Sequence, residues 1–132
     1  MRKILKIALK IFGIILIGLI GTVVSFFLAI HFIFAGTCGN EVLSATDSPN
    51  GKYTAHLFTR DCGATTVESY QLSILKKGKK LKNKGGNTFV AKEQFDVEWT
   101  DDRQLTVAYP TSAKTFKMKS KKGKVDIVYS TK

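Results

Sequence analysis

The sequence is poor in the residues from which catalytic and metal sites are commonly built. Its 132 residues include two histidines, His31 and His56, and two cysteines, Cys38 and Cys62. His31 lies in an apolar segment, and His56 has no cysteine or carboxylate nearby at metal-ligand spacing, so we expect no metal site. No G-x-S-x-G motif or other nucleophile–base arrangement is present either. We therefore expect no enzymatic activity and no cofactor.

Formal charge is absent from residues 11–35. This stretch reads IFGIILIGLIGTVVSFFLAIHFIFA, and about 20 apolar residues span a bilayer as a helix. Four cations precede it: Arg2, Lys3, Lys6 and Lys10. Positive charge of this kind keeps a short tail cytoplasmic. We therefore expect a single-pass cell-membrane protein with a basic cytoplasmic tail at 1–10, a transmembrane helix at 11–35 and an extracytoplasmic domain at 36–132.

A cleaved signal peptide is the alternative for the same segment. Its apolar core would be about 7–15 residues long and would end in small residues at the cleavage point. The uncharged run here is longer, and residues 35–37 (Ala-Gly-Thr) match a cleavage or lipidation site poorly. We therefore expect the segment to remain in place as a signal-anchor.

Small residues recur along this segment at four-residue spacing, at Gly21, Ser25 and Ala29. Such a stripe lets two membrane helices pack closely, although it also arises by chance in anchors. A homodimer through this helix face is one hypothesis.

Helical periodicity is absent after residue 40, and apolar–polar alternation takes its place. The alternation is clear along 69–74, 95–100, 105–109 and 125–129, and it is typical of half-buried strands. Polar turns such as the SPNG sequence at 48–51 separate these runs. We expect about seven or eight short antiparallel strands, near residues 42–47, 52–59, 66–75, 88–91, 94–100, 103–109, 114–118 and 123–129.

The strand order indicates an all-β domain built as an antiparallel meander, because most neighbours are joined by short turns. Segments 48–55 and 99–107 share the turn-and-strand signature of β-propeller blades. A propeller needs at least about four blades of about 40 residues, so two blade-like units in a curled sheet or small sandwich are expected instead. The expected core residues are Tyr53, Leu57, Tyr70, Leu72, Ile74, Phe95, Val97, Trp99, Leu105, Val107, Phe116, Val125 and Ile127. The strand at 53–58 is less regular and is a candidate for burial on both faces.

The two cysteines follow the apolar segment, on the side of the membrane where disulfides form. A bond between Cys38 and Cys62 would stabilise the domain by about 3–4 kcal/mol through loop closure. Neither cysteine belongs to a C-x-x-C motif on a helix, so redox catalysis is not indicated. Free or lipid-modified cysteines are the alternative to this structural disulfide.

The loop after Cys62 is a candidate binding loop, since its backbone N–H groups and hydroxyls could face an anion. It comprises Gly63, Ala64, Thr65 and Thr66, with Arg60 beside it. The alternative is a plain turn leading into the next strand.

Acidic residues are scarce, with 10 against 21 lysines and arginines, and residues 36–132 alone carry a net charge of +7. The densest basic run holds Lys76, Lys77, Lys79, Lys80, Lys82 and Lys84. Anionic lipid headgroups or anionic cell-wall polymers suit such a surface. No aromatic residue interleaves with these lysines, which argues against nucleic acid. A solvated loop is the alternative.

Three motifs carry a resemblance to a known family: CGNE at 38–41, SPNGK at 48–52 and RDCGATT at 60–66. With them the chain resembles a domain-of-unknown-function family of small bacterial membrane-anchored or exported proteins. The sequence departs from the family pattern at Asn50, where Asp is usual, and at 67–70, where VESY replaces Gly-Phe-Ser-Thr. The resemblance covers most of residues 38–75 and implies the fold but no chemistry.

Two functions fit these observations. The first is a non-enzymatic binding or accessory module at the cell surface, whose partner is another membrane or cell-envelope protein. The second is a cationic module that binds anionic lipid or wall polymer through its lysine-rich loop.

Overall fold

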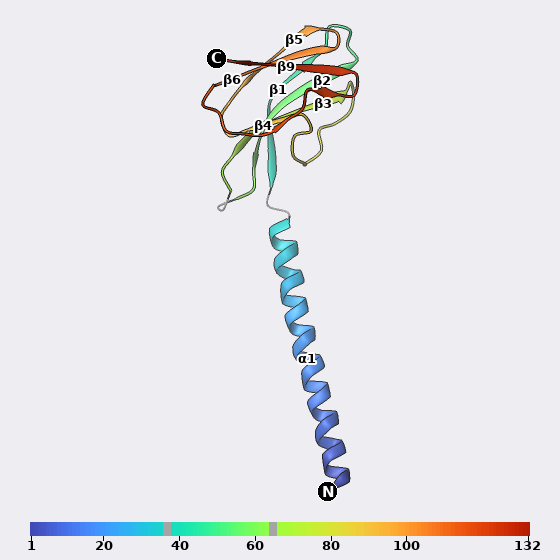
Figure 1. Cartoon of the computed structure of the whole chain (residues 1–132). Helices are drawn as coiled ribbons and strands as arrows, with labels where there is room; N and C mark the ends of the chain where they lie inside the picture. Colours follow the sequence, from blue (N-terminus) through green and yellow to red (C-terminus); the bar gives the residue numbers. More distant parts are fainter. Residues whose placement is uncertain (36–37, 64–65) are drawn as a thin grey trace. The chain divides into compact units, whose positions relative to one another are not determined.

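The computed structural model of the chain describes residues 1–35, 38–63 and 66–132 (Figure 1). The chain divides into two compact units, Met1–Thr37 and Cys38–Lys132. The first unit contains one long helix. The second unit, which we call the β domain, contains the nine strands found among the described residues. The predicted fold class, an N-terminal apolar helix followed by an all-β domain, is confirmed.

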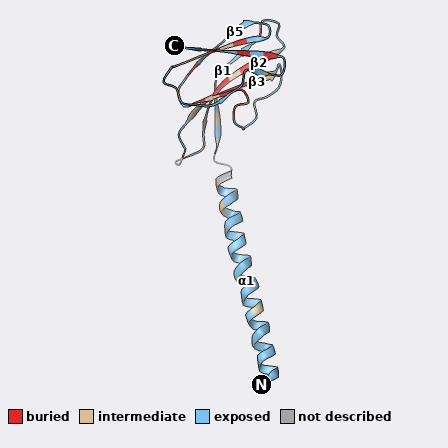
Figure 2. Cartoon of the chain, in the orientation of Figure 1, coloured by how far each residue is buried: buried red, intermediate tan, exposed pale blue. Residues whose placement is uncertain are grey.

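Helix α1 (Arg2–Ala35) is 34 residues long. Its large apolar side chains are exposed along its length, whereas the buried residues in Figure 2 lie in the β domain. Among the described residues, α1 is the one helix whose length and composition qualify it as a membrane span or signal-anchor. The helix begins at Arg2, so the basic residues of the predicted tail are helical as well. The division into tail, span and outer domain stays a prediction.

Two sheets form the β domain. The first has the order β1-β2-β3-β4-β7 and the second the order β5-β6-β9-β8. The strands are β1 (Gly39–Asp47), β2 (Tyr53–Asp61), β3 (Ser69–Lys76), β4 (Phe89–Ala91), β5 (Asp96–Asp101), β6 (Gln104–Tyr109), β7 (Thr115–Met118), β8 (Lys121–Lys122) and β9 (Val125–Thr131). Each predicted strand corresponds to one of these, and β8 is additional.

One strand pair departs from the expected antiparallel meander, because β6 and β9 are parallel. After β6 the chain crosses to the first sheet, where β7 pairs with β4. It then returns to the second sheet, where β8 and β9 pair with each other. Strand β9 lies beside β6 and runs in the same direction. A parallel pair requires a crossover of this kind, whereas a hairpin always gives an antiparallel pair.

Both sheets contribute inward-facing side chains to a single core. Leu72 and Phe89 of the first sheet and Leu105, Val107 and Val125 of the second are completely buried. The complete core cluster comprises Ala55, Leu57, Leu72, Ile74, Phe89, Ala91, Phe95, Leu105, Val107, Val125 and Ile127.

One expected core residue, Phe116, lies outside this core. It is 58% exposed because β7 is the edge strand of its sheet. Phe89, which the prediction left out, meets the predicted core residue Phe95 edge to face, with ring centroids 4.7 Å apart. Aromatic pairs favour this arrangement.

The outer face of the first sheet is covered near β3 by residues 77–88, which we call the lysine loop. Gln71 and Ser73 are buried on this face, and Phe58 of the neighbouring strand is completely buried although it faces away from Leu57. The prediction that the strand at 53–58 is buried on both faces is thus confirmed.

The lysine loop lies directly against β3. Its Thr88 N–H donates to the Leu72 carbonyl at 3.1 Å, and its Asn87 side chain bridges the Ile74 N–H and C=O, each at 3.0 Å. Gly86 is required at this approach, since a Cβ there would stand 2.9 Å from the Leu72 carbonyl oxygen.

Cys38 and Cys62 form the predicted disulfide. It joins the residues flanking the Gly39–Asp61 pair, where β1 begins and β2 ends. This end of the β domain therefore cannot fray without breaking a covalent bond.

Candidate functional site

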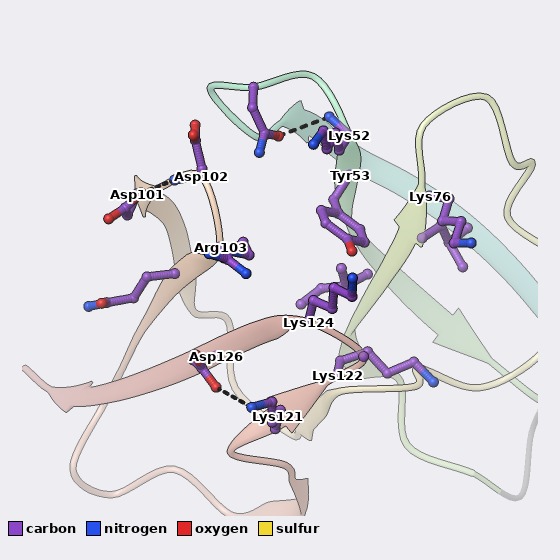
Figure 3. A pocket seen from close by; sticks show the side chains of 15 residues that line it. Lys52, Tyr53, Lys76, Asp101, Asp102, Arg103, Lys121, Lys122, Lys124 and Asp126 are labelled. Atoms are coloured by element: carbon purple, nitrogen blue, oxygen red, sulfur yellow. Dashed lines mark hydrogen bonds and ion pairs between the residues drawn. The ribbon is translucent and has the colours of Figure 1, made fainter.

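A cleft of about 1330 Å³ opens where β2 begins and β3 ends, at the end of these strands opposite the disulfide (Figure 3). The turns that join β1 to β2, β5 to β6 and β8 to β9 surround it. Its lining is Asn50, Lys52, Tyr53, Ile74, Leu75, Lys76, Asp101, Asp102, Arg103, Gln104, Lys121, Lys122, Gly123, Lys124 and Asp126.

The β1–β2 turn positions Lys52 and Tyr53 at the cleft. The buried Ser48 hydroxyl donates to the Asn50 side chain at 2.9 Å and accepts from the Tyr53 N–H at 3.1 Å. Asn50 in turn accepts from the Lys52 N–H at 3.0 Å. Gly51 supplies the positive φ of 66° that closes the turn, a conformation that favours glycine. The predicted SPNG turn is therefore the structural base of one cleft wall.

The opposite wall comes from the second sheet. The Asp126 N–H donates to the Arg103 carbonyl at 2.8 Å, which joins the start of β9 to the start of β6. In Figure 3, Tyr53 extends from β2 into the middle of the cleft, with Arg103 on one side and Lys76 on the other. The apolar body of Tyr53 packs against the core, so the floor of the cleft is rigid while its rim is polar.

Positive charge dominates the rim. Six cations line the cleft, namely Lys52, Lys76, Arg103, Lys121, Lys122 and Lys124, against the three acids Asp101, Asp102 and Asp126. One cation is neutralised locally, since Lys121 pairs with Asp126 at 3.4 Å. Among the described residues the other five cations have no ion pair. Several unpaired cations around one opening attract an anionic group from solution.

The residues predicted as a binding loop lie at the other end of the β domain. Arg60 donates from Nη1 to the side-chain oxygens of Asn40 at 2.6 Å and Asn83 at 2.9 Å. The Gly63 N–H donates to Asp61, and Thr66 donates from its N–H to the Gly63 carbonyl at 3.1 Å. Ala64 and Thr65 lie outside the described residues. These contacts favour a turn, and a binding role for this loop stays a prediction.

The six lysines predicted as polyanion contacts are divided by the structure. Lys76 lines the cleft. Lys77 pairs with Asp47, whose pKa is lowered mainly by that hydrogen bond and also by one from Thr54 at 2.6 Å. The remaining four, Lys79, Lys80, Lys82 and Lys84, are exposed and lie away from the cleft lining.

Sequence reasoning missed most of the cleft because its cations come from separate turns. Lys52 ends the β1–β2 turn, Arg103 ends the β5–β6 turn, and Lys121, Lys122 and Lys124 belong to the β8–β9 hairpin. The only signal in the sequence was that every one of these turns ends in a cation. No spacing rule indicates that the three turns meet.

The structure offers little for metal chemistry in the part of the chain that it describes. No three His, Cys, Asp or Glu side chains there lie close enough to hold a metal ion. His56 Nε2 is buried between β1 and β3 without a hydrogen-bond partner among the described residues. The cations that line the cleft are suited to holding an anionic group.

Comparison with known proteins identifies one family. The model of the "Family of unknown function (DUF5412)" matches residues 2–120 of the chain. No curated protein and no solved structure matches. The matched range includes both α1 and most of the β domain.

Proposed function

The chain belongs to this family of unknown function, and we propose that it is a membrane-anchored binding module whose cationic cleft takes an anionic polymer. In this proposal α1 spans the cell membrane with its basic end in the cytoplasm, and the β domain lies outside. Four cations at the start of α1 support that orientation. The Cys38–Cys62 bond supports it as well, because structural disulfides persist in oxidising compartments.

The observation that carries the binding role is the cluster of five unpaired cations around the cleft. They come from different turns and converge on one opening, which a merely solvated surface does not require. Held apart by rigid turns, they also repel one another, and a bound anion would relieve that repulsion.

The weakness of each single ion pair in the cleft favours a polymer over a small anion. The lysines that line it are exposed or half-buried, so each contributes only about 0.2–1 kcal/mol to an ion pair. A single phosphate could contact few of them at once. A chain of phosphates or carboxylates could contact them in succession, and such contacts accumulate along the polymer.

The test measures polyphosphate binding to the full chain in nanodiscs of neutral lipid. Fluorescence anisotropy of labelled polyphosphate gives Kd at low and high salt. The cleft variant carries Arg103→Gln and Lys124→Gln, and the matched control carries Lys80→Gln and Lys84→Gln. The cleft variant removes two exposed positive charges from the cleft, and the control removes two exposed positive charges from the lysine loop.

We expect the cleft variant to bind polyphosphate about five- to tenfold more weakly than the wild-type chain, and the Kd of the control to change less than about twofold. Raising the salt from about 50 to about 500 mM should weaken binding at least about tenfold. If the lysine-loop variant alone weakens binding, the alternative function through that loop is right. Equal losses in both variants would mean that net charge, and not the cleft, attracts the polymer.

A further inference from the structure

A second, smaller hollow of about 380 Å³ lies at the disulfide end of the β domain. The first residues of β1 and the tip of the lysine loop form it together. Its lining is Gly39, Asn40, Val42, Leu81, Lys82 and Asn83. We call it the lysine groove.

Hydrogen bonds hold the backbone of the lysine loop at this groove. The Asn40 side chain donates to the carbonyls of Lys82 at 3.2 Å and Lys84 at 2.9 Å. Asn83 donates from Nδ2 to the Cys38 carbonyl at 2.8 Å. The Arg60 guanidinium donates to the side-chain oxygens of both asparagines and so joins the two contacts. The loop is thus fixed to Cys38 of the disulfide and to the start of β1.

The side chains around the groove combine exposed apolar surface with unpaired positive charge. Val42 is 50% exposed and Leu81 is half-buried beside it. Four lysines of the loop, Lys79, Lys80, Lys82 and Lys84, are exposed and have no ion pair among the described residues. Apolar side chains flanked by lysines are the chemistry with which proteins contact an anionic membrane surface.

The chain itself limits how far this surface can be from a membrane. Only Gly36 and Thr37 separate the last residue of α1 from Cys38, and three Cα–Cα steps reach at most about 11 Å. If α1 crosses a bilayer, residues 38–40 lie within reach of the headgroup layer. The lysine loop is hydrogen-bonded to those same residues.

We propose that the lysine groove binds the headgroup of an anionic phospholipid from the membrane that α1 crosses. The lysine ammonium groups contact the lipid phosphate, and Val42 and Leu81 face the glycerol and upper acyl region. This inference rests on the membrane anchorage in the proposed function but not on the cleft, which lies at the other end of β2 and β3. Each lysine near an anionic surface adds about 1 kcal/mol of attraction.

Hydrogen exchange of the full chain in nanodiscs tests the proposal. The probe is phosphatidylglycerol, compared with phosphatidylcholine alone, and the readout is the exchange rate of amides in residues 79–84. We expect exchange at least about fivefold slower with phosphatidylglycerol, because bound lipid suppresses local opening of the loop. Equal rates in the two lipids would overturn the proposal.

Matched variants separate the groove from general charge. Lys80→Gln, Lys82→Gln and Lys84→Gln together should abolish the slowing, whereas Lys52→Gln, Lys122→Gln and Lys124→Gln should leave it intact. Val42→Ser keeps every charge and should reduce the slowing. Slowing that persists in the loop variant, or disappears equally in the cleft variant, contradicts a lipid site in the groove.

Two further outcomes identify what is wrong if the proposal fails. Polyphosphate added to neutral nanodiscs should not slow exchange in residues 79–84; if it does so as strongly as phosphatidylglycerol, the loop binds polymer and not lipid. A chain that does not incorporate into nanodiscs would refute the anchorage, and the lipid site with it. Polymer binding at the cleft can fail without affecting the lipid dependence.

Discussion

Replacing Gly86 with alanine should detach the lysine loop from the sheet. A Cβ at this position would stand 2.9 Å from the Leu72 carbonyl oxygen, 3.1 Å from Gln71 Cβ and 3.2 Å from the Leu72 backbone nitrogen. Two of these neighbours are backbone atoms of β3, which is hydrogen-bonded on both sides and cannot move. The loop must therefore shift outward.

The cost follows from the contacts that this shift disturbs. Overpacking at a closely packed position costs about 1–3 kcal/mol. The Gly86 N–H also donates to the buried side chain of Gln71, and a buried polar group left unsatisfied costs about 1–3 kcal/mol more. We expect Gly86→Ala to lower the free energy of unfolding by about 2–6 kcal/mol, which is a fall in Tm of at least about 8 °C for a domain of this size.

Gly85 provides a matched control one residue away. A Cβ there would meet only the Gln71 Oε1 atom, at 3.4 Å, which is an ordinary contact. Gly85→Ala should therefore be neutral or slightly stabilising, since alanine restricts the unfolded chain. Thermal unfolding of both full-length variants in detergent, followed by fluorescence of the single tryptophan, compares them. If Gly86→Ala is as stable as Gly85→Ala, the loop is not packed against β3 as described.

Three other predictions concern the disulfide end and the core. Arg60→Ala should lower stability by about 1.5–3 kcal/mol and speed amide exchange in the lysine loop, because it removes the charged donor shared by two asparagines; unchanged exchange would contradict this. Replacing Cys38 and Cys62 together with serine should cost about 3–4 kcal/mol, and alkylation of either thiol in the unreduced wild-type protein would contradict the bond. Burial raises the pKa of Tyr129, whose hydroxyl donates to the Lys119 carbonyl, from 10 to about 12, so stability should fall as the pH rises from 10 to 12, and Tyr129→Phe should flatten that part of the pH–stability curve.

The strands and the disulfide could be predicted because their signals are local. Alternation along 105–109 and 125–129 reports which face of each strand is buried, and Leu105, Val107, Val125 and Ile127 are indeed in the core. Two cysteines that follow an apolar segment can bond only with each other within one chain. The apolar helix is predictable for the same reason, since length and composition define it.

The arrangement of these elements could not be predicted in the same way. Alternation does not tell which strands are neighbours, so nothing in the sequence indicated that β9 lies parallel to β6. Nor does it distinguish a central strand from an edge strand, which is why Phe116 was expected inside the core and is exposed. Nor did the sequence indicate that the lysine loop lies against β3, where polar side chains such as Asn87 hold its backbone. Such side-chain contacts between distant segments leave no periodic trace.

The central claim is that an anionic polymer binds in the cleft, and NMR titration of the full chain with polyphosphate in neutral micelles tests it most directly. We expect the largest amide shifts at Lys52, Arg103, Lys122 and Lys124, which line the cleft from three separate hairpins. Shifts confined to residues 79–84, or no shifts at low salt, would contradict it.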